Sequence, residues 1–324
     1  MDIYVKKAII HQFSPDDTDL YLADKFLNIT PKIEEYLRKK IERVYSDEAR
    51  TGIFEEDNPF LEMISDDLLE TSVVVANRWK EEFVVSENQK TNDLVFIQFS
   101  KEGVDHFAFL RIALRETLTH LGGEVDNPIK LTQNNLPGFG TGADEALVIN
   151  LQSRKYHLIE KRIKYNGTFL NYFSENLLQA QPKISPKKSI KELEKTAQKI
   201  AESFNTDDFQ FQSKVKSAIF NHIEEENKLS PEKLADDLFD DNLTARLSFI
   251  DQVKEAVPEP VTFEEIDASR QLKKFENQKL SLSNGIELIV PNNVYEDAES
   301  VEFILNENGT YSILIKNIED IQSK

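Results

Sequence analysis

Hydrophobic residues in the first half of the chain alternate over short runs that are separated by helically spaced segments. Helices are expected from Pro31, from about Asn58 and over 67–85, since Thr30 supplies a capping hydroxyl before a proline at the first helical position. The alternating or continuously apolar runs predict strands at 5–13, 20–24, 94–99, 104–114, 129–136, 146–151 and 156–159. We therefore expect residues 1–178 to form an α+β domain with an antiparallel sheet and packed helices.

The second half begins with a helical pattern and ends with a strand pattern. Ser189 and Glu192 have the spacing of a capping box, and two further helices are expected over 214–226 and 231–239. Asn284-Gly285 and Asn308-Gly309 each separate two alternating runs, which is a strong hairpin signal. We expect a helical domain over 179–260 and a small β-rich domain over 261–324, so that the whole chain is of the α+β class.

Composition supports a folded protein and removes several kinds of chemistry. Hydrophobic residues make up 40% of the 324 positions and there are 21 Phe, which argues against global disorder. There is no cysteine, so disulfides, thiolate nucleophiles and cysteine-based zinc sites are excluded, and a reducing compartment fits. The run Ala8-Ile9-Ile10 is too short for a signal-peptide core, and no apolar stretch has the length of a membrane span. We expect a cytoplasmic protein that does not contact a membrane.

Charge is distributed very unevenly along the chain. The net charge is −19, which taken alone points away from a polyanionic partner. Residues 153–199, however, contain eleven Lys and Arg against four Glu, a local charge of +7 that leaves −26 on the rest. One surface could therefore contact phosphates while the remainder keeps the protein soluble.

The second part of this basic segment has a helical arrangement of lysines. Lys188, Lys191, Lys195 and Lys199 are spaced three, four and four residues apart, so they fall within an arc of about 80° on a helix. Lys183 and Lys187 extend the row at its start. A row of ammonium groups suits phosphate contacts that carry no base specificity, and it equally suits a simple solvated helix face. The spacing alone leaves both interpretations open.

The first part of the basic segment mixes cations with aromatic residues. The cations are Arg154, Lys155, Lys161, Arg162 and Lys164. Such a mixture can bind single strands by stacking, but aromatic residues more often belong to a core. Phe169 and Phe173 are four residues apart, so we expect both to lie in the core on one helix.

Other candidate sites are weaker. The loop Gly138-Phe-Gly-Thr-Gly142 lacks the strand before it and the helix after it that a dinucleotide site requires, so we expect a flexible loop. The carboxylate groups at 55–57, 66–67, 236–237 and 240–241 have no calcium-loop spacing. The five histidines are scattered, and none forms a His-Glu-x-x-His motif. We predict no catalytic residue, no metal and no cofactor.

Several short stretches, in this order, resemble the bacterial 37-kDa nucleoid-associated protein family of the NdpA type. They are Lys7-Ala-Ile-Ile-His-Gln12, Arg43-Val-Tyr-Ser46 with Gly52-Ile-Phe54, Tyr156-His-Leu-Ile-Glu-Lys161 with Gly167 and Tyr172-Phe173, and Arg270-Gln-Leu-Lys-Lys-Phe275. The similarity spans nearly the whole chain. It implies a protein of the nucleoid that binds DNA, or machinery bound to DNA, without catalytic activity.

The charge pattern and the resemblance support three hypotheses. The first is a non-enzymatic protein that binds double-stranded DNA, with single strands as a further expectation, through the eleven basic residues of 154–199. The second is an acidic adaptor that reaches DNA through a DNA-processing enzyme. The third is a metal-dependent nuclease that uses acids near the sheet. The exposed edges of the C-terminal hairpins leave a homodimer open.

Overall fold

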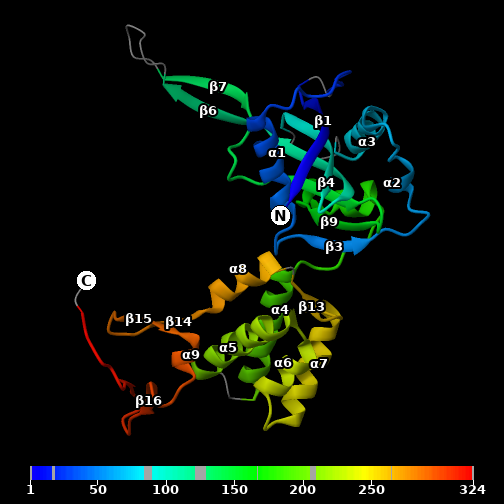
Figure 1. Cartoon of the computed structure of the whole chain (residues 1–324). Coiled ribbons are helices and arrows are strands. Elements are labelled where there is room, and N and C mark those ends of the chain that lie inside the picture. The colour runs from blue at the N-terminus through cyan, green and yellow to red at the C-terminus, as the bar shows by residue number, and fades with distance from the viewer. Residues whose placement is uncertain are drawn as a thin grey trace. The chain divides into compact units, whose positions relative to one another are not determined.

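The computed structural model describes residues 2–16, 19–83, 90–120, 129–165, 167–204, 209–263 and 265–322, with the backbone alone at 265–267 and 270. The chain divides into two compact units, residues 1–185 and 186–324 (Figure 1). The α+β class expected from the sequence is confirmed. The expected division into three domains at 178 and 260 remains a prediction.

The first unit is built on a seven-stranded antiparallel sheet. Its strand order is β2-β1-β4-β5-β8-β9-β3. The strands are β1 Ile3–Ser14, β2 Asp19–Tyr21, β3 Arg50–Ile53, β4 Asn92–Lys101, β5 Val104–Ala113, β8 Glu145–Asn150 and β9 Lys155–Ile159. The predicted strand at 129–136 belongs elsewhere: β7 Ile129–Asn135 pairs only with β6 Arg115–His120, among the described residues, in a projecting hairpin (Figure 1).

Helices cover both faces of this sheet. They are α1 Pro31–Val44, α2 Pro59–Glu62 and α3 Leu68–Phe83, and a short π-helix Phe173–Leu177 comes later in the chain. Thr30 caps α1 as predicted, because its hydroxyl accepts from the Ile33 amide. The last two residues expected in α3, Val84 and Val85, lie outside the described residues.

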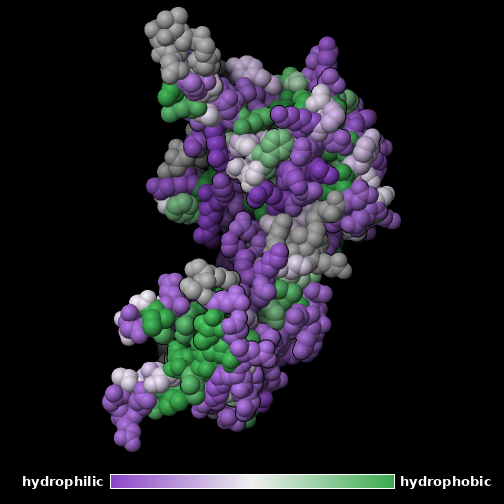
Figure 2. All heavy atoms as spheres, turned by 60° about the vertical axis from the view of Figure 1, so that its left-hand side comes forward, coloured by the Kyte–Doolittle hydropathy of each residue, from purple (hydrophilic) through white to green (hydrophobic). Residues whose placement is uncertain are grey.

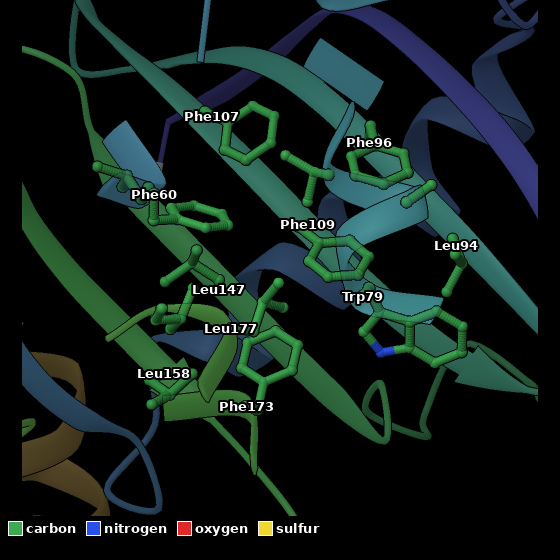
Figure 3. Packing of buried hydrophobic residues seen from close by; sticks show 14 of the residues in the cluster. Phe60, Trp79, Leu94, Phe96, Phe107, Phe109, Leu147, Leu158, Phe173 and Leu177 are labelled. Carbon is green, nitrogen blue, oxygen red and sulfur yellow. The ribbon is translucent and has the colours of Figure 1, made fainter. Parts of the chain in front are cut away.

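Two hydrophobic clusters fill the space between the helices and the sheet. Leu94 and Phe96 of β4 point towards α3, whereas Val95, Ile97 and Phe99 point towards α1. Figure 3 shows the aromatic cluster on the α3 side, to which Trp79 belongs. Burial on both faces explains why β4 has a continuous apolar run rather than an alternating one.

The second unit begins with four helices, α4 Pro186–Ser203, α5 Phe209–Glu226, α6 Pro231–Leu238 and α7 Leu243–Ala256. Helix α7 was not expected. The predicted capping box is wrong: α4 begins at Pro186, and Ser189 lies inside it with only 2% of its surface exposed. Pro186 has the φ that a helix requires at its first position, so α4 starts about one turn before the predicted cap at Ser189.

The rest of the second unit consists of short strands and two helices. The two-residue strands β12 Lys228–Leu229 and β13 Val261–Thr262 pair with each other, and α8 Glu265–Phe275 comes after them. Two hairpins come next, β14 Asn277–Ser281 with β15 Glu287–Pro291 and β16 Val301–Leu305 with β17 Tyr311–Ile315, separated by α9 Asn292–Tyr295. Both predicted hairpins are confirmed, with Gly285 and Gly309 at positive φ in their turns.

Candidate nucleic-acid interface

Helix α4 has one buried apolar face and one exposed basic face. Its buried residues include Ile190, Leu193, Ala197, Ile200 and Ala201, and the helix packs on α7 and α5. Figure 1 shows α4 beside these helices in the second unit. The apolar residues recur at helical spacing, so a single side of α4 is held against the unit and the other side faces solvent.

The exposed side carries the α4 lysine row, which we define as Lys188, Lys191, Lys195 and Lys199. All four side chains are exposed, and Lys187 is exposed beside them. The Lys199 ammonium donates to Gln252 Oε1 of α7 at 3.0 Å, so the end of the row is tied to the helix pair. Glu202 is also exposed and lies beyond the row on the same side of α4.

The other candidate cations before α4 begin with five residues of the first unit, on strand β9 and on either side of it. They are Arg154, Lys155, Lys161, Arg162 and Lys164. Lys155 is in β9, Lys164 is in β10 Ile163–Tyr165, and Arg162 is exposed between them. Arg154 and Lys161 pair with acids: Arg154 Nη1 lies 2.9 Å from Glu56 Oε1, and Lys161 Nζ lies 2.6 Å from Asp144 Oδ1. These pairs reduce the positive charge that the first part can offer to a phosphate.

The eleven candidate cations are therefore divided between the two units. The first five and Lys183 belong to the first unit, where the Lys183 amide donates to the Thr51 carbonyl at 2.8 Å. Lys187 and the α4 lysine row belong to the second unit. Among these candidates, the α4 lysine row is the set of exposed cations that lies along one side of a single helix.

A short hairpin corrects the prediction made for Phe169. This residue lies in strand β11 Thr168–Leu170, which pairs with β10, and 61% of its surface is exposed. Lys164 lies directly across from Phe169 on one face of the hairpin. Ile163 and Leu170, which pair with each other, lie on the opposite face and pack against the core. The predicted core position is correct for Phe173, whose side chain is fully buried. Tyr165 at the same hairpin is 40% exposed.

The glycine-rich loop is closed around a buried lysine. Lys40 of α1 is fully buried, and its ammonium donates to the carbonyls of Pro137, Gly138 and Thr141. The Tyr36 hydroxyl also donates to the Pro137 carbonyl, at 3.0 Å. An anion-binding loop directs its amides at a ligand, whereas this loop directs carbonyls at an ammonium. The loop is therefore a structural element of the first unit.

Lys40 gives stability a distinct dependence on pH. Burial first, and then the charges of Arg43 and Arg115, lower the pKa of Lys40 to about 8. An unfolded lysine titrates near 10.4, so between these values the folded state binds fewer protons than the unfolded state. The cost of burying the ammonium is thus fully present below pH 8 and is relieved as pH rises towards 10.

We therefore expect the melting temperature of the native protein to rise relative to that of Lys40→Met between pH 8 and pH 10. Thermal unfolding by circular dichroism at several pH values measures this difference. Lys39→Met, at an exposed position on the same helix, is the control substitution. A difference between native protein and Lys40→Met that stays constant or shrinks over this range would contradict the assignment.

A buried ion pair that the sequence did not indicate lies in the core of the first unit. Arg111 of β5 and Glu145 of β8 are cross-strand partners, with Nε and Oε2 2.7 Å apart and 7% and 0% of their surfaces exposed. The Tyr172 hydroxyl donates to the same carboxylate, and Trp79 Nε1 donates to Tyr172 at 3.0 Å. Burial and then the Glu145 charge raise the pKa of Tyr172 well above its usual value.

Several of the candidate carboxylates, and one histidine, pair with neighbouring groups in the described part of the chain. Asp236 pairs with Arg246, Asp240 with Lys214 and Asp237 with His222. Asp67 accepts from the Leu69 amide at the start of α3. Among the described residues, no group of three or more His, Asp or Glu side chains is arranged to hold a metal ion. None of the described helices is long and apolar enough to cross a membrane.

Comparison with known proteins adds the family. A search of the curated proteins found no match. A family model described as nucleoid-associated protein YejK matches residues 9–321, which is nearly the whole chain. The match includes both structural units and every one of the basic residues discussed above. The chain therefore belongs to the family of the nucleoid-associated protein YejK.

Proposed function

We propose that this protein binds double-stranded DNA in the nucleoid through phosphate contacts from the α4 lysine row, without strong sequence preference and without catalysis. The observation that carries the proposal is a row of exposed ammonium groups on a helix whose opposite face is buried. The row spans roughly 16 Å from Lys188 to Lys199 at 1.5 Å per residue. Backbone phosphates along part of one helical turn of duplex lie within this reach.

Segregation of charge makes this contact compatible with the acidic chain. Helix α4 itself carries five Lys against three Glu, a charge of +2, although the whole chain carries −19. At physiological ionic strength the screening length is about 8 Å, so acids farther than that from a bound phosphate contribute little repulsion. Lysine ammonium groups without a fixed planar geometry contact phosphates as point charges, which fits binding that is independent of base sequence.

The test is the dependence of affinity on salt. If the α4 lysine row neutralises four phosphates, log K against log salt has a slope of about −3.6 from this row alone. Affinity for a random-sequence duplex should then fall roughly 150-fold between 50 and 200 mM salt. Fluorescence anisotropy with duplexes of two unrelated sequences measures both the slope and the sequence dependence. Binding that does not respond to salt would remove the proposal.

The exposed hairpin β10–β11 supports a smaller contribution on single strands. Phe169 offers an exposed ring beside Lys164, which is the combination that stacks on an unpaired base and contacts its phosphate. We expect Phe169→Ala to weaken single-strand binding by about 1–3 kcal/mol, the usual loss of one stacked base, and to change duplex binding little. Anisotropy with a labelled single strand and its duplex measures the two affinities.

Tyr4→Ala is the matched control for this prediction. Tyr4 is 63% exposed, close to the exposure of Phe169, but lies on β1 outside the basic segment. The control should leave both affinities unchanged. Equal losses in Phe169→Ala and Tyr4→Ala would show that exposed aromatic area, rather than this hairpin, governs single-strand binding.

The adaptor and nuclease hypotheses are separated by the same purified protein. An adaptor would not shift duplex DNA even at low salt, yet it would be retained on DNA once a DNA-processing enzyme is added. A nuclease would degrade DNA when Mg²⁺ is supplied. We expect direct, salt-sensitive binding and intact DNA.

A further inference from the structure

Hairpin β10–β11 carries an exposed aromatic ring on each of its two faces. Phe169 is 61% exposed and lies on one face, across from Lys164. Tyr165 is 40% exposed and lies on the other face, because side chains alternate along a strand. Two rings on opposite faces of one short hairpin form a wedge that can lie between flat groups. We call Phe169, Tyr165 and the hairpin that holds them the β10–β11 wedge.

The wedge is held in place at its base. Ile163 and Leu170, which pair with each other, pack against the core on the α3 side, and only 6% of Ile163 is exposed. Tyr172, two residues after β11, is fully buried and donates to the Glu145 carboxylate. A ring that is carried by an anchored hairpin loses little conformational freedom when it stacks on a ligand.

The chain that forms the wedge and the residues before it is positively charged. Residues 154–165 contain five cations and one acid, a local charge of 5 − 1 = +4. That acid, Glu160, has only 5% of its side chain exposed and pairs with Arg50. Arg162 and Lys164 are exposed, so positive charge remains at the hairpin although other cations of this range pair with acids. Exposed rings beside cations favour a nucleic acid, in which every base is flanked by phosphates.

An exposed ring in the second unit lacks this combination. Figure 2 shows hydrophobic side chains gathered on one side of that unit. Tyr311 of β17 is 52% exposed there, but the same hairpin exposes Glu302 and Glu307. These acids would repel the phosphates next to a stacked base, so the β10–β11 wedge is the better candidate for base stacking.

A fully paired duplex offers the wedge little to stack on. Its bases are stacked on one another and present only their edges in the grooves. Drawing a paired base out of the stack costs about as much free energy as stacking it on a ring returns, whereas an unpaired base has no partner to lose. The wedge therefore gains affinity only where bases are already unpaired.

We infer that the β10–β11 wedge directs this protein to duplex DNA that contains unpaired bases, such as a mismatched stretch or a gap. The inference rests on the proposed function, in which the paired part of the DNA is held through its phosphates. Phe169 stacks on one unpaired base and Tyr165 on a second, while Arg162 and Lys164 contact neighbouring phosphates. Binding is then independent of base sequence but dependent on base pairing.

Fluorescence anisotropy with three labelled DNAs tests the inference. They are a fully paired duplex, the same duplex with a short central mismatch, and the mismatched duplex with its unpaired bases removed to leave abasic sugars. We expect the native protein to bind the mismatched duplex about 5- to 150-fold more tightly than the paired one, the affinity equivalent of one stacked base. The abasic duplex should bind no more tightly than the paired one, because it offers nothing to stack on.

Substitutions at exposed positions separate a flat ring from apolar area. Phe169→Leu keeps apolar area and removes the ring, so it should bring the ratio of the two affinities close to one, whereas Phe169→Trp should keep the ratio. Tyr4→Leu, at a 63% exposed position on β1, is the matched control and should also keep it. A fluorescent purine analogue at the mismatch gives a second readout, since stacking by the native protein should quench it and Phe169→Leu should not.

The outcomes distinguish this inference from the proposed function. Equal, salt-sensitive affinity for the paired and mismatched duplexes would overturn the inference and leave duplex binding by the α4 lysine row in place. Binding of the mismatched duplex alone would support the wedge and contradict duplex binding by the row. A preference that persists in Phe169→Leu or on the abasic duplex would overturn the inference, because neither the ring nor the bases would then be its cause.

Discussion

Reversing the charge of all four lysines in the α4 lysine row is expected to abolish measurable binding to duplex DNA at 50 mM salt. The native row releases counterions from the phosphates that it contacts, and glutamates at the same positions would repel those phosphates. Loss of the four contacts alone should weaken binding roughly 100-fold or more at low salt, and repulsion adds to this. Anisotropy with a labelled duplex measures the loss, and circular dichroism checks that α4 still folds.

The control for this variant makes the same change in net charge elsewhere. Lys25, Lys32, Lys39 and Lys254 are all exposed and all lie outside residues 153–199. Their joint replacement by glutamate should leave most of the affinity in place. Equal losses in the two variants would mean that overall charge, rather than the position of the α4 lysine row, determines DNA binding.

Replacing Glu145 by alanine is expected to lower the free energy of unfolding of the first unit by about 3–5 kcal/mol. The substitution removes the charged partner of the buried Arg111 guanidinium, which keeps its hydrogen bond to the Asn92 side chain at 2.9 Å, and it removes the acceptor of the Tyr172 hydroxyl. An unpaired buried charge costs far more than an exposed one, because water no longer solvates it.

Urea unfolding followed by tryptophan fluorescence measures this loss directly. The chain has one tryptophan, Trp79, which is fully buried and hydrogen-bonded to Tyr172, so its emission reports on the first unit. Arg111→Met combined with Glu145→Leu removes both charges and should recover most of the stability. A loss below about 1 kcal/mol in Glu145→Ala would contradict the assignment of a buried ion pair.

The sequence predicted those elements whose side-chain pattern is set by the chain itself. Strand β4 has a continuous apolar run because helices cover both sides of it, and Thr30-Pro31 determines the start of α1. The two Asn-Gly pairs predicted the C-terminal hairpins for the same reason, because the last residue of each three-residue turn has positive φ, which glycine adopts readily. Local chemistry was sufficient in each of these cases.

The features that the sequence did not reveal depend on contacts between distant residues. Arg111 and Glu145 are 34 positions apart and meet only because β5 and β8 are neighbours in register. Phe169 has the spacing of a helical core residue relative to Phe173, but β10 pairs with β11 and turns its ring outward. Lys40 is buried because a loop about 100 residues later closes over it.

The candidate site shows the same division. The arc of the α4 lysine row could be derived from sequence spacing, and its exposure in the structure agrees with that derivation. All eleven basic residues lie in one segment of the sequence. Their position there did not reveal that they divide between two units, or that Arg154 and Lys161 pair with acids. Proximity in sequence identified the cations, but tertiary structure decided which of them stand together.

The most direct test of DNA binding by the α4 lysine row compares salt dependence between the native protein and a variant with all four of these lysines changed to glutamine. Glutamine keeps the helix and removes the charge, so the comparison isolates the number of phosphates that the row neutralises. We predict that the slope of log K against log salt becomes less steep by about 3.6. An unchanged slope would show that the row does not contact DNA and would contradict the proposed function.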